Sequence, residues 1–446
     1  MRCFLIATNK AQTPYPVYPL ALACLAGALI EAGHEVEQFD CLGQQENVRE
    51  NLAAAIGRFQ PELVGLSIRN LDSEDSTRPE SFLQDAVRIM GWVRDNTPAP
   101  VVIGGAAFSL MPERIVNLLQ PDFGIVGEGE RLLVELADSL AKNMPPTEKI
   151  LRSPLAEAPW KSLSFDRKIS SYYLKRGGIL NVQTKRGCPY RCAYCSYPLL
   201  EGKQIRTREP EAVVDDVLRL ERDFQARYIF FTDSVFNDPG GSYLEVCEAL
   251  IRRGNKLPWT GYFRPTRMKR EHMDIMKRSG LDAMEVGTDC GCDATLASVN
   301  KGFTFDDVIS FHELAREFKI PCAHFIMFGA PGENRETVRE SLDNLERLDP
   351  AVLMAFNGIR ILPRTGIHAR AIADGIIGEN QDLLEPTYYF SPEIQPGEID
   401  TLIQKSWRNR PDRICPGASD TQRVAMFHKK GFTGPIWDKI IRMGWK

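Results

Sequence analysis

Short apolar runs alternate with longer amphipathic stretches over residues 1–142. The apolar runs read RCFLIAT, EVEQFD, LVGLSI, PVVIGG and FGIVG, and helical stretches such as LALACLAGALIEAG and VRENLAAAIGRF lie between them. Strands this short and apolar suit burial on both faces, and their alternation with helices is typical of a parallel sheet. The pattern predicts a doubly wound, Rossmann-like α/β domain over 1–142, with its ligand beyond the carboxyl ends of the strands.

A second alternating series follows an irregular, proline-bearing stretch over 143–176, which we interpret as a linker. Its strands read GGILNVQT, RYIFFTDSVF, PWTGYFRP, DAMEVGTDCG, PCAHFIMFG and AVLMAFNGIRILP. Six strand–helix units predict a partial (β/α)6 barrel over 177–370, with its chemistry at the carboxyl-end rim of the strands. Residues 371–446 lack a clear period, and we expect them to form a small, mostly helical cap that shapes the substrate site.

Composition narrows the class of protein. The 446 residues are 43% hydrophobic and 26% charged, with a net charge of −4, which is typical of a folded globular protein and does not favour nucleic acid as a partner. The apolar stretch YPLALACLAGALIEAG is too short for a membrane span, and the N-terminal run is too short for a signal peptide. We therefore expect a cytoplasmic protein whose eleven cysteines are reduced thiols or metal ligands.

The stretch TKRGCPYRCAYC places Cys188, Cys192 and Cys195 on one loop, directly after the first strand of the second series. Gly187 and Pro189 favour a tight, non-helical wrap around the first cysteine. Three thiolates can hold three corners of a cubane iron–sulfur cluster, which leaves the fourth iron free. The alternative is a Cys3His zinc site that a distant histidine completes.

This stretch resembles the radical S-adenosylmethionine (SAM) superfamily, whose hallmark is CxxxCxΦC with an aromatic residue before the last cysteine, here Tyr194. The resemblance implies a 4Fe-4S cluster on the three cysteines and SAM on the open iron. It further implies that an electron, supplied by a flavodoxin-like or ferredoxin-like donor, cleaves SAM to methionine and a 5′-deoxyadenosyl radical.

Other segments of the second domain resemble SAM-contacting parts of that superfamily. In FFTDSVF the glycines of the superfamily are missing, and Asp233 is the polar residue that remains. Glu285 and Asp289 in MEVGTDCG and Gly329 in FIMFGAPGEN are further candidates, together with Tyr194. The alternative for Glu285 and Asp289 is a strand-end carboxylate that is bonded to backbone or to an arginine.

The first domain resembles the cobalamin-binding domain that precedes many radical SAM enzymes. This resemblance implies a cobalamin site at the strand ends and at the GEGE segment, where glycines admit a bulky group and a helix begins. The DxHxxG segment that supplies a cobalt-binding histidine in other cobalamin proteins is absent, because Asp40 is followed by Cys41, Leu42 and Gly43. The expected contacts are Ser67, Arg69, Asn70, Gly104, Gly105, Gly127, Glu128 and Glu130.

Arg69 and Asn70 are candidates to approach the lower face of cobalamin. An arginine stays protonated and does not readily ligate a metal, so Arg69 would hold that face open or exclude water. The alternative is that these two residues belong to a hydrogen-bonded loop.

The resemblance favours a cobalamin-dependent radical SAM methyltransferase acting on an unactivated carbon or a phosphorus centre of a small molecule or peptide. One SAM would methylate cobalamin, and a second would supply the radical that activates the substrate. Cobalamin-dependent cyclisation or rearrangement without methyl transfer is the first alternative. A methylthiotransferase fits less well, because Cys3, Cys24 and Cys41 lack the matching context and the C-terminal segment shows no compact basic domain.

Three further features have two interpretations each. Cys290 and Cys292 suggest a second metal site or core packing, and core packing is favoured. His324 faces either the barrel interior or the core. The aromatic run Tyr388–Phe390 either closes the substrate pocket or packs the C-terminal segment against the barrel.

Overall fold

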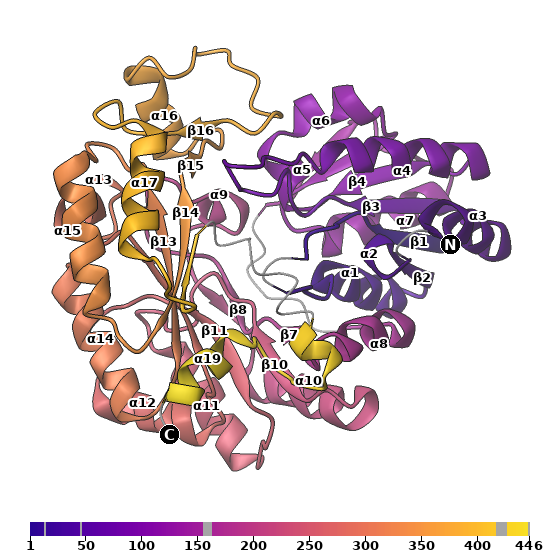
Figure 1. Cartoon of the computed structure of the whole chain (residues 1–446). Helices are drawn as coiled ribbons and strands as arrows, with labels where there is room; N and C mark the ends of the chain where they lie inside the picture. The colour runs from indigo at the N-terminus through magenta and orange to yellow at the C-terminus, as the bar shows by residue number, and fades with distance from the viewer. Residues whose placement is uncertain (13–14, 45–46, 155–162, 416–425, 445–446) are drawn as a thin grey trace.

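The computed structural model describes residues 1–12, 15–44, 47–154, 163–415 and 426–444. Two α/β units lie side by side, and the C-terminal segment packs along the second unit (Figure 1). The predicted fold class, a doubly wound domain followed by a partial barrel, is confirmed.

A parallel sheet forms the centre of the first unit. Within the described residues it has six strands in the order β2-β1-β3-β4-β5-β6. The order reverses between β1 and β3, and ligands bind at such switch points in doubly wound sheets. The strands are β1 (Arg2–Ala7), β2 (Glu35–Asp40), β3 (Leu63–Ser67), β4 (Val101–Gly104), β5 (Phe123–Val126) and β6 (Ile150–Arg152).

Both faces of this sheet are buried because its side chains alternate between two cores. Phe4 and Ile6 of β1 pack with Leu66 on one face, whereas Leu5 packs with Leu29 on the other. Continuous apolar strands require this double burial. The covering helices are α1 (Leu20–Glu31), α2 (Cys41–Gln44), α3 (Val48–Phe59), α4 (Leu83–Asn96), α5 (Ala106–Leu110), α6 (Pro112–Leu119) and α7 (Glu130–Ala141).

The second unit is a partial barrel of parallel strands. In the part of the chain that the structure describes, its order is β17-β14-β13-β12-β11-β10-β7. Ile229 and Phe231 of β10 point outward to the helices, whereas Tyr228 and Phe230 point inward and meet Tyr15 of the first unit. Its first six strands are β7 (Ile179–Val182), β10 (Tyr228–Phe231), β11 (Trp259–Phe263), β12 (Met284–Asp289), β13 (Cys322–Phe328) and β14 (Val352–Asn357).

Helices follow these strands on the outside of the barrel, as the alternating pattern predicts. Between β7 and β10, a two-residue hairpin of β8 (Lys185–Arg186) and β9 (Arg206–Thr207) brackets the cysteine loop. The helices are α8 (Arg167–Lys175), α9 (Tyr197–Leu200), α10 (Pro210–Phe224), α11 (Ser242–Arg252), α12 (Arg270–Arg278), α13 (Asp293–Ser298), α14 (Phe305–Glu317) and α15 (Arg335–Glu346).

The C-terminal segment adds short strands to the helices expected there. β15 (Ile359–Arg360) and β16 (Tyr388–Tyr389) form an antiparallel pair, and β17 (Arg413–Ile414) extends the barrel sheet beyond β14. The helices of this segment are α16 (Gly366–Ala373), α17 (Pro396–Ser406) and α19 (Trp437–Gly444).

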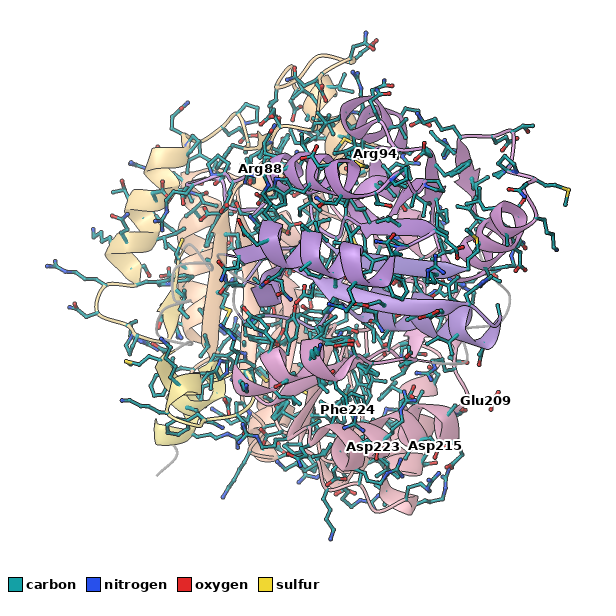
Figure 2. The ribbon with its side chains drawn as sticks, turned by 90° about the vertical axis from the view of Figure 1, so that its right-hand side faces the viewer. Arg88, Arg94, Glu209, Asp215, Asp223 and Phe224 are labelled. Carbon is teal, nitrogen blue, oxygen red and sulfur yellow. The ribbon has the colours of Figure 1, made fainter. Side chains whose placement is uncertain are left out.

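The helices are amphipathic and carry charged residues on their outer faces. Examples are Arg88 and Arg94 on α4 and Asp215 and Asp223 on α10 (Figure 2). Within the described ranges, no helix has the length and apolar character needed to cross a membrane.

Candidate active site

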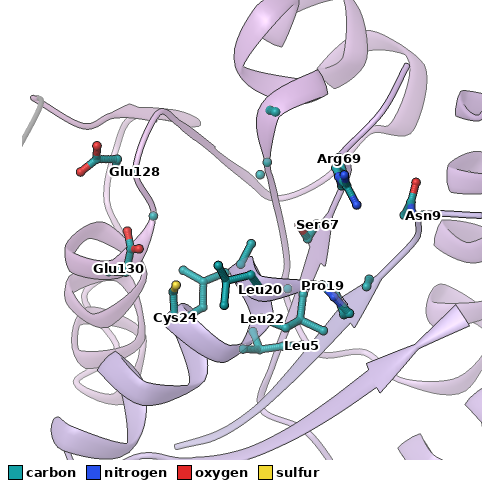
Figure 3. A pocket seen from close by; sticks show the side chains of 18 of the residues that line it. Leu5, Asn9, Pro19, Leu20, Leu22, Cys24, Ser67, Arg69, Glu128 and Glu130 are labelled. Atoms are coloured by element: carbon teal, nitrogen blue, oxygen red, sulfur yellow. The ribbon is translucent and has the colours of Figure 1, made fainter. Parts of the chain in front are cut away.

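A cavity of about 330 Å³ lies between the two units. One wall consists of the carboxyl ends of β1, β3, β4 and β5 and the start of α1, and the other consists of residues after β7 (Figure 3). The cavity therefore opens at the β1/β3 switch point, where the strand-order rule predicts a ligand.

The residues predicted to contact cobalamin gather at this cavity. All of them except Asn70 line it: Ser67, Arg69, Gly104, Gly105, Gly127, Glu128 and Glu130. Asn70 lies beside Arg69, and its side-chain oxygen Oδ1 is buried without a hydrogen-bond partner among the described residues. The structure thus brings the predicted set together, while its contacts with cobalamin stay a prediction.

The cavity has the shape and lining that a bulky, partly apolar group requires. It extends between the sheet and α1 and α7, where its walls are the apolar side chains of Leu5, Leu22 and Leu133. Gly105 has φ +100°, and a Cβ there would lie 2.6 Å from the carbonyl oxygen of Ile68. Only glycine therefore allows the chain to pass here between β4 and the open space. These residues fit a corrinoid held against the strand ends.

Several residues of the cavity wall were not in the predicted set. Asp40 ends β2, and its carboxylate accepts a hydrogen bond of 2.9 Å from Tyr173 on α8. Burial raises the pKa of Asp40 to about 6. The place of Asp40 at a strand end is visible in the sequence, but Tyr173 and Tyr197 reach the wall from segments without such a signal.

Ion pairs connect the GEGE segment to the cysteine loop. Arg186, two residues before Cys188, donates a hydrogen bond of 2.6 Å to Glu130 and lies 3.3 Å from Glu128. Arg206 on the opposite strand of the hairpin also pairs with Glu128. The two glutamates therefore fix the hairpin that carries the cysteine loop against the first unit.

The cysteine loop is held in its shape by backbone contacts. Gly187 has φ +96°, and a Cβ there would lie 2.0 Å from the carbonyl oxygen of Gln204, so no larger residue fits. The amide of Cys188 donates to Gly202 at 3.0 Å, and the amide of Ala193 donates to Val299 at 2.9 Å. The loop is thereby anchored to two separate segments of the barrel.

All three cysteines of the loop are free thiols; Cys188 is buried, and Cys192 and Cys195 are partly exposed. Within the described ranges, no histidine joins them in a close metal-ligating group. The donor set therefore fits an iron–sulfur cluster with one open iron better than a zinc site that a histidine completes.

Tyr194 and Asp289 meet beside this loop. The tyrosine hydroxyl donates to Asp289 Oδ2, which also accepts a bond of 2.5 Å from the ammonium group of Lys301. Burial opposes the charge on Lys301, but Asp289 more than offsets this and raises the pKa of Lys301. Lys301 was not predicted, because only the folded chain brings it to the end of β12.

Asp233 lies at the end of β10 with its oxygens engaged inside the protein. It accepts hydrogen bonds of 2.7 Å from the amide of Thr184 and 2.6 Å from the Thr184 hydroxyl, and it lies 3.5 Å from the ammonium group of Lys185. In this arrangement Asp233 holds the chain between β7 and the cysteine loop.

Glu285 points into the barrel, where it is fully buried. Its carboxylate accepts a hydrogen bond of 2.6 Å from the hydroxyl of Tyr15, and burial raises the pKa of Glu285 to about 7. The contact joins the first unit to the barrel.

Gly329 ends β13 at the same rim. Its φ is +95°, and a Cβ there would lie 3.1 Å from the ring of Phe390. Gly358 approaches the same ring more closely, with a Cβ–Cζ distance of 2.6 Å. Phe390 thus packs on two glycines, and Tyr389 is buried with its hydroxyl 2.6 Å from Asp374. These two aromatic residues pack the C-terminal segment against the barrel.

The remaining candidates lie in the core. His324 is fully buried, bonds to Thr288 at 2.8 Å and lies 3.2 Å from His312 of α14. Burial lowers the pKa of both imidazoles. Cys290 and Cys292 are also buried, in agreement with the packing interpretation.

Comparison with known proteins identifies both units. Residues 182–345 match the radical SAM superfamily, and residues 7–137 match the B12 binding domain. The chain is 25% identical over 443 residues to tryptophan 2-C-methyltransferase of Streptomyces laurentii, with 82% of this chain and 74% of the relative covered. It is 25% identical over 351 residues to anaerobic magnesium-protoporphyrin IX monomethyl ester cyclase of Cereibacter sphaeroides, with 72% and 55% covered.

A solved structure resembles the whole chain. It is the radical SAM methyltransferase TsrM from Kitasatospora setae with tryptophan and a SAM analogue bound, with a TM-score of 0.86, 23% identity and 100% of both chains covered. The two matched domains and the cavity between them define an enzyme of the radical SAM class. The chain belongs to the cobalamin-binding radical SAM family, so its cofactors are a 4Fe-4S cluster, SAM and cobalamin.

Proposed function

We propose that this enzyme transfers a methyl group from SAM, by way of cobalamin, to a carbon or phosphorus centre of a small molecule. The observation that carries the proposal is the shared cavity: residues close to the cysteine loop, Arg186 and Tyr197, line the same space as the cobalamin-domain residues Ser67 and Gly104. Cobalamin would supply a methyl carrier in this space, and the cluster with SAM would supply radical chemistry.

In this proposal Cys188, Cys192 and Cys195 hold the cluster, and the strand ends of the first unit hold cobalamin. Arg69 is exposed to the cavity and has no ion-pair partner among the described residues. Because arginine stays protonated, Arg69 would occupy the space under the corrinoid without ligating the metal. Asn70, whose Oδ1 lacks a partner, would orient polar groups beside it.

We further propose that the substrate is a small aromatic molecule bound in the barrel. Tyr262 of β11 is 36% exposed, although its neighbours Gly261 and Phe263 are buried, so its ring faces an open part of the barrel interior. Phe325 and Met327 are the partly exposed positions of β13. Aromatic and thioether side chains suit a flat apolar ring. The tryptophan substrate named for two similar proteins supports this class.

The decisive experiment is an anaerobic assay with SAM that carries a deuterated methyl group. The reconstituted enzyme is incubated with a reductant and a panel of aromatic small molecules, tryptophan first. We expect product that carries the labelled methyl, together with S-adenosylhomocysteine. Formation of 5′-deoxyadenosine in equal amount would support the two-SAM route. Label that remains in methionine and SAM with every substrate, while 5′-deoxyadenosine forms, would contradict methyl transfer.

That second outcome would favour cyclisation or rearrangement. The observation in its favour is the similarity to a magnesium-protoporphyrin IX monomethyl ester cyclase over 72% of the chain. A porphyrin ester in the same panel tests it directly. In either case we propose that a flavodoxin-like or ferredoxin-like protein supplies the electron to the cluster, and a peptide substrate is a further member of the panel.

A further inference from the structure

Arg264 lies against the cysteine loop, immediately after β11. Its guanidinium group is 3.8 Å from the centre of the Tyr190 ring and 4.8 Å from that of Phe303. Its Nη1 atom lies 3.8 Å from Cys192 Sγ, within hydrogen-bond distance of a sulfur atom. The side chain is thus caged by two aromatic rings and directed at the central cysteine of the motif.

The position of Arg264 is fixed by its backbone. The amide of Arg264 donates to Asn237 Oδ1 at 2.9 Å, and the side-chain amide of Asn237 donates back to the carbonyl of Arg264 at 2.8 Å. A two-sided clamp of this kind sets the direction of the arginine side chain before any cofactor binds.

Arg264 differs from the other buried cations in having no carboxylate partner. It is 7% exposed, and no Asp or Glu of the described chain forms an ion pair with it; its Nε atom is buried without an acceptor. By contrast, Lys301 pairs with Asp289 at 2.5 Å. The pairs Lys185–Asp238 (3.1 Å), Arg208–Asp216 (2.6 Å) and Arg360–Asp72 (2.7 Å) follow the same pattern.

An unpaired buried charge is costly, and arginine cannot lose its proton to avoid the cost. Aromatic rings compensate only part of it. The full compensation must come from negative charge on the group that the guanidinium faces, and that group is the sulfur of Cys192. Thiolate is the form in which cysteine ligates iron.

We propose that Arg264 is the counter-cation of the iron–sulfur cluster and raises its reduction potential. Reduction adds an electron to a cluster that already carries three thiolates, so a fixed positive charge beside Cys192 stabilises the reduced state more than the oxidised state. Arg264 is a positioning residue in this sense. The inference rests on the assignment of the cluster to Cys188, Cys192 and Cys195.

The test is a potentiometric titration of the cluster, followed by electron paramagnetic resonance (EPR), in reconstituted full-length protein. Arg264→Gln removes the charge, Arg264→Lys keeps it, and Arg267→Gln removes a charge from an exposed arginine three residues away, whose side chain is 90% exposed and pairs with Asp307. We expect a lower midpoint potential in Arg264→Gln, a potential close to wild type in Arg264→Lys and no change in Arg267→Gln. An unchanged potential in Arg264→Gln, or an equal drop in both Arg264 variants, would overturn the proposal.

A measurement on the wild-type protein does not depend on the stability of any variant. Pulsed EPR of the reduced cluster, in protein labelled with 15N-arginine, should show a nitrogen coupling that Arg264→Lys removes. Absence of that coupling contradicts the proposal, even if Arg264→Gln fails to retain a cluster. A cluster that persists in Cys192→Ala at wild-type content would instead contradict the cysteine assignment, so the two failures are distinct.

Discussion

The hydroxyl of Tyr15, from the loop after β1, lies 2.6 Å from the carboxylate of Glu285 inside the barrel. The ring of Tyr15 packs edge-on against Phe230, with 6.1 Å between the ring centres. A side chain of the cobalamin-binding domain thus occupies part of the barrel interior, and Glu285 is its polar contact there.

Glu285 makes the stability of the fold depend on pH. Its pKa rises from 4.5 to about 7 through burial, so the native state holds the carboxyl protonated over that interval. This contribution is present below pH 4.5 and is lost as pH rises through 7, on the order of 3 kcal/mol at about 1.4 kcal/mol per pH unit. Glu285→Gln should therefore gain stability relative to wild type between pH 5 and pH 8, measured by urea unfolding. Parallel profiles for the two proteins would contradict this, and Glu135→Gln, exposed on α7, controls for general effects of pH.

Replacement of any one of Cys188, Cys192 and Cys195 by alanine should abolish the cluster. The remaining two thiolates cannot hold three corners of a cubane. The measurement is the broad visible absorption and the iron content after anaerobic reconstitution. Cys247→Ala, in the core beside α11, is the matched control and should retain both. A cluster at full content in any of the loop variants would exclude that cysteine as a ligand.

Gly105→Ala should destabilise the first unit and weaken cobalamin binding. Its backbone, with φ +100° and ψ 176°, belongs to a region that only glycine adopts readily, and the added Cβ would lie 2.6 Å from a carbonyl oxygen. We expect a loss of about 1–3 kcal/mol. Gly57→Ala is the control, since nothing lies within 4 Å of its position in α3 and the helix should gain about 0.5–1 kcal/mol. Thermal unfolding and corrinoid absorbance measure both effects, and equal behaviour of the two variants would contradict this account.

Lys301→Met should destabilise the protein by about 3 kcal/mol, because it leaves Asp289 buried without its cation. The double variant Asp289→Asn with Lys301→Met should recover part of that loss, since no buried charge remains. Chemical unfolding of the cofactor-free protein measures each value. Arg278→Met, which breaks the exposed pair with Asp274, should cost less than about 1 kcal/mol. A double variant less stable than Lys301→Met would show that the ion pair is not the source of the effect.

The sequence was most informative where a motif or a strand end fixes position. The three cysteines follow from their spacing, and Ser67, Gly104 and Gly105 follow from the rule that parallel strands present their carboxyl ends at one edge. The fold class follows from the alternation of apolar runs. These signals are local, and the folded chain keeps them.

The contacts that the sequence did not reveal join segments far apart in the chain. Lys301 reaches Asp289 from the turn after α13, and Arg264 reaches Cys192 across 72 residues. Tyr15 meets Glu285 across 270 residues. No periodicity marks such residues, because their role depends on which strands become neighbours. Asp233 shows the converse, since its strand-end position is visible but its hydrogen bonds to Thr184 are not.

The pairing of Arg186 with Glu130 has a thermodynamic consequence for cofactor loading. Arg186 is two residues from Cys188 and also lines the cavity at the switch point, so one side chain is held by both sites. If filling the cavity restrains this hairpin, the thiols of the loop lose less entropy when iron binds. Coupling free energies between two binding events are reciprocal. Whatever factor an occupied corrinoid cavity adds to cluster retention, an assembled cluster must add to corrinoid affinity.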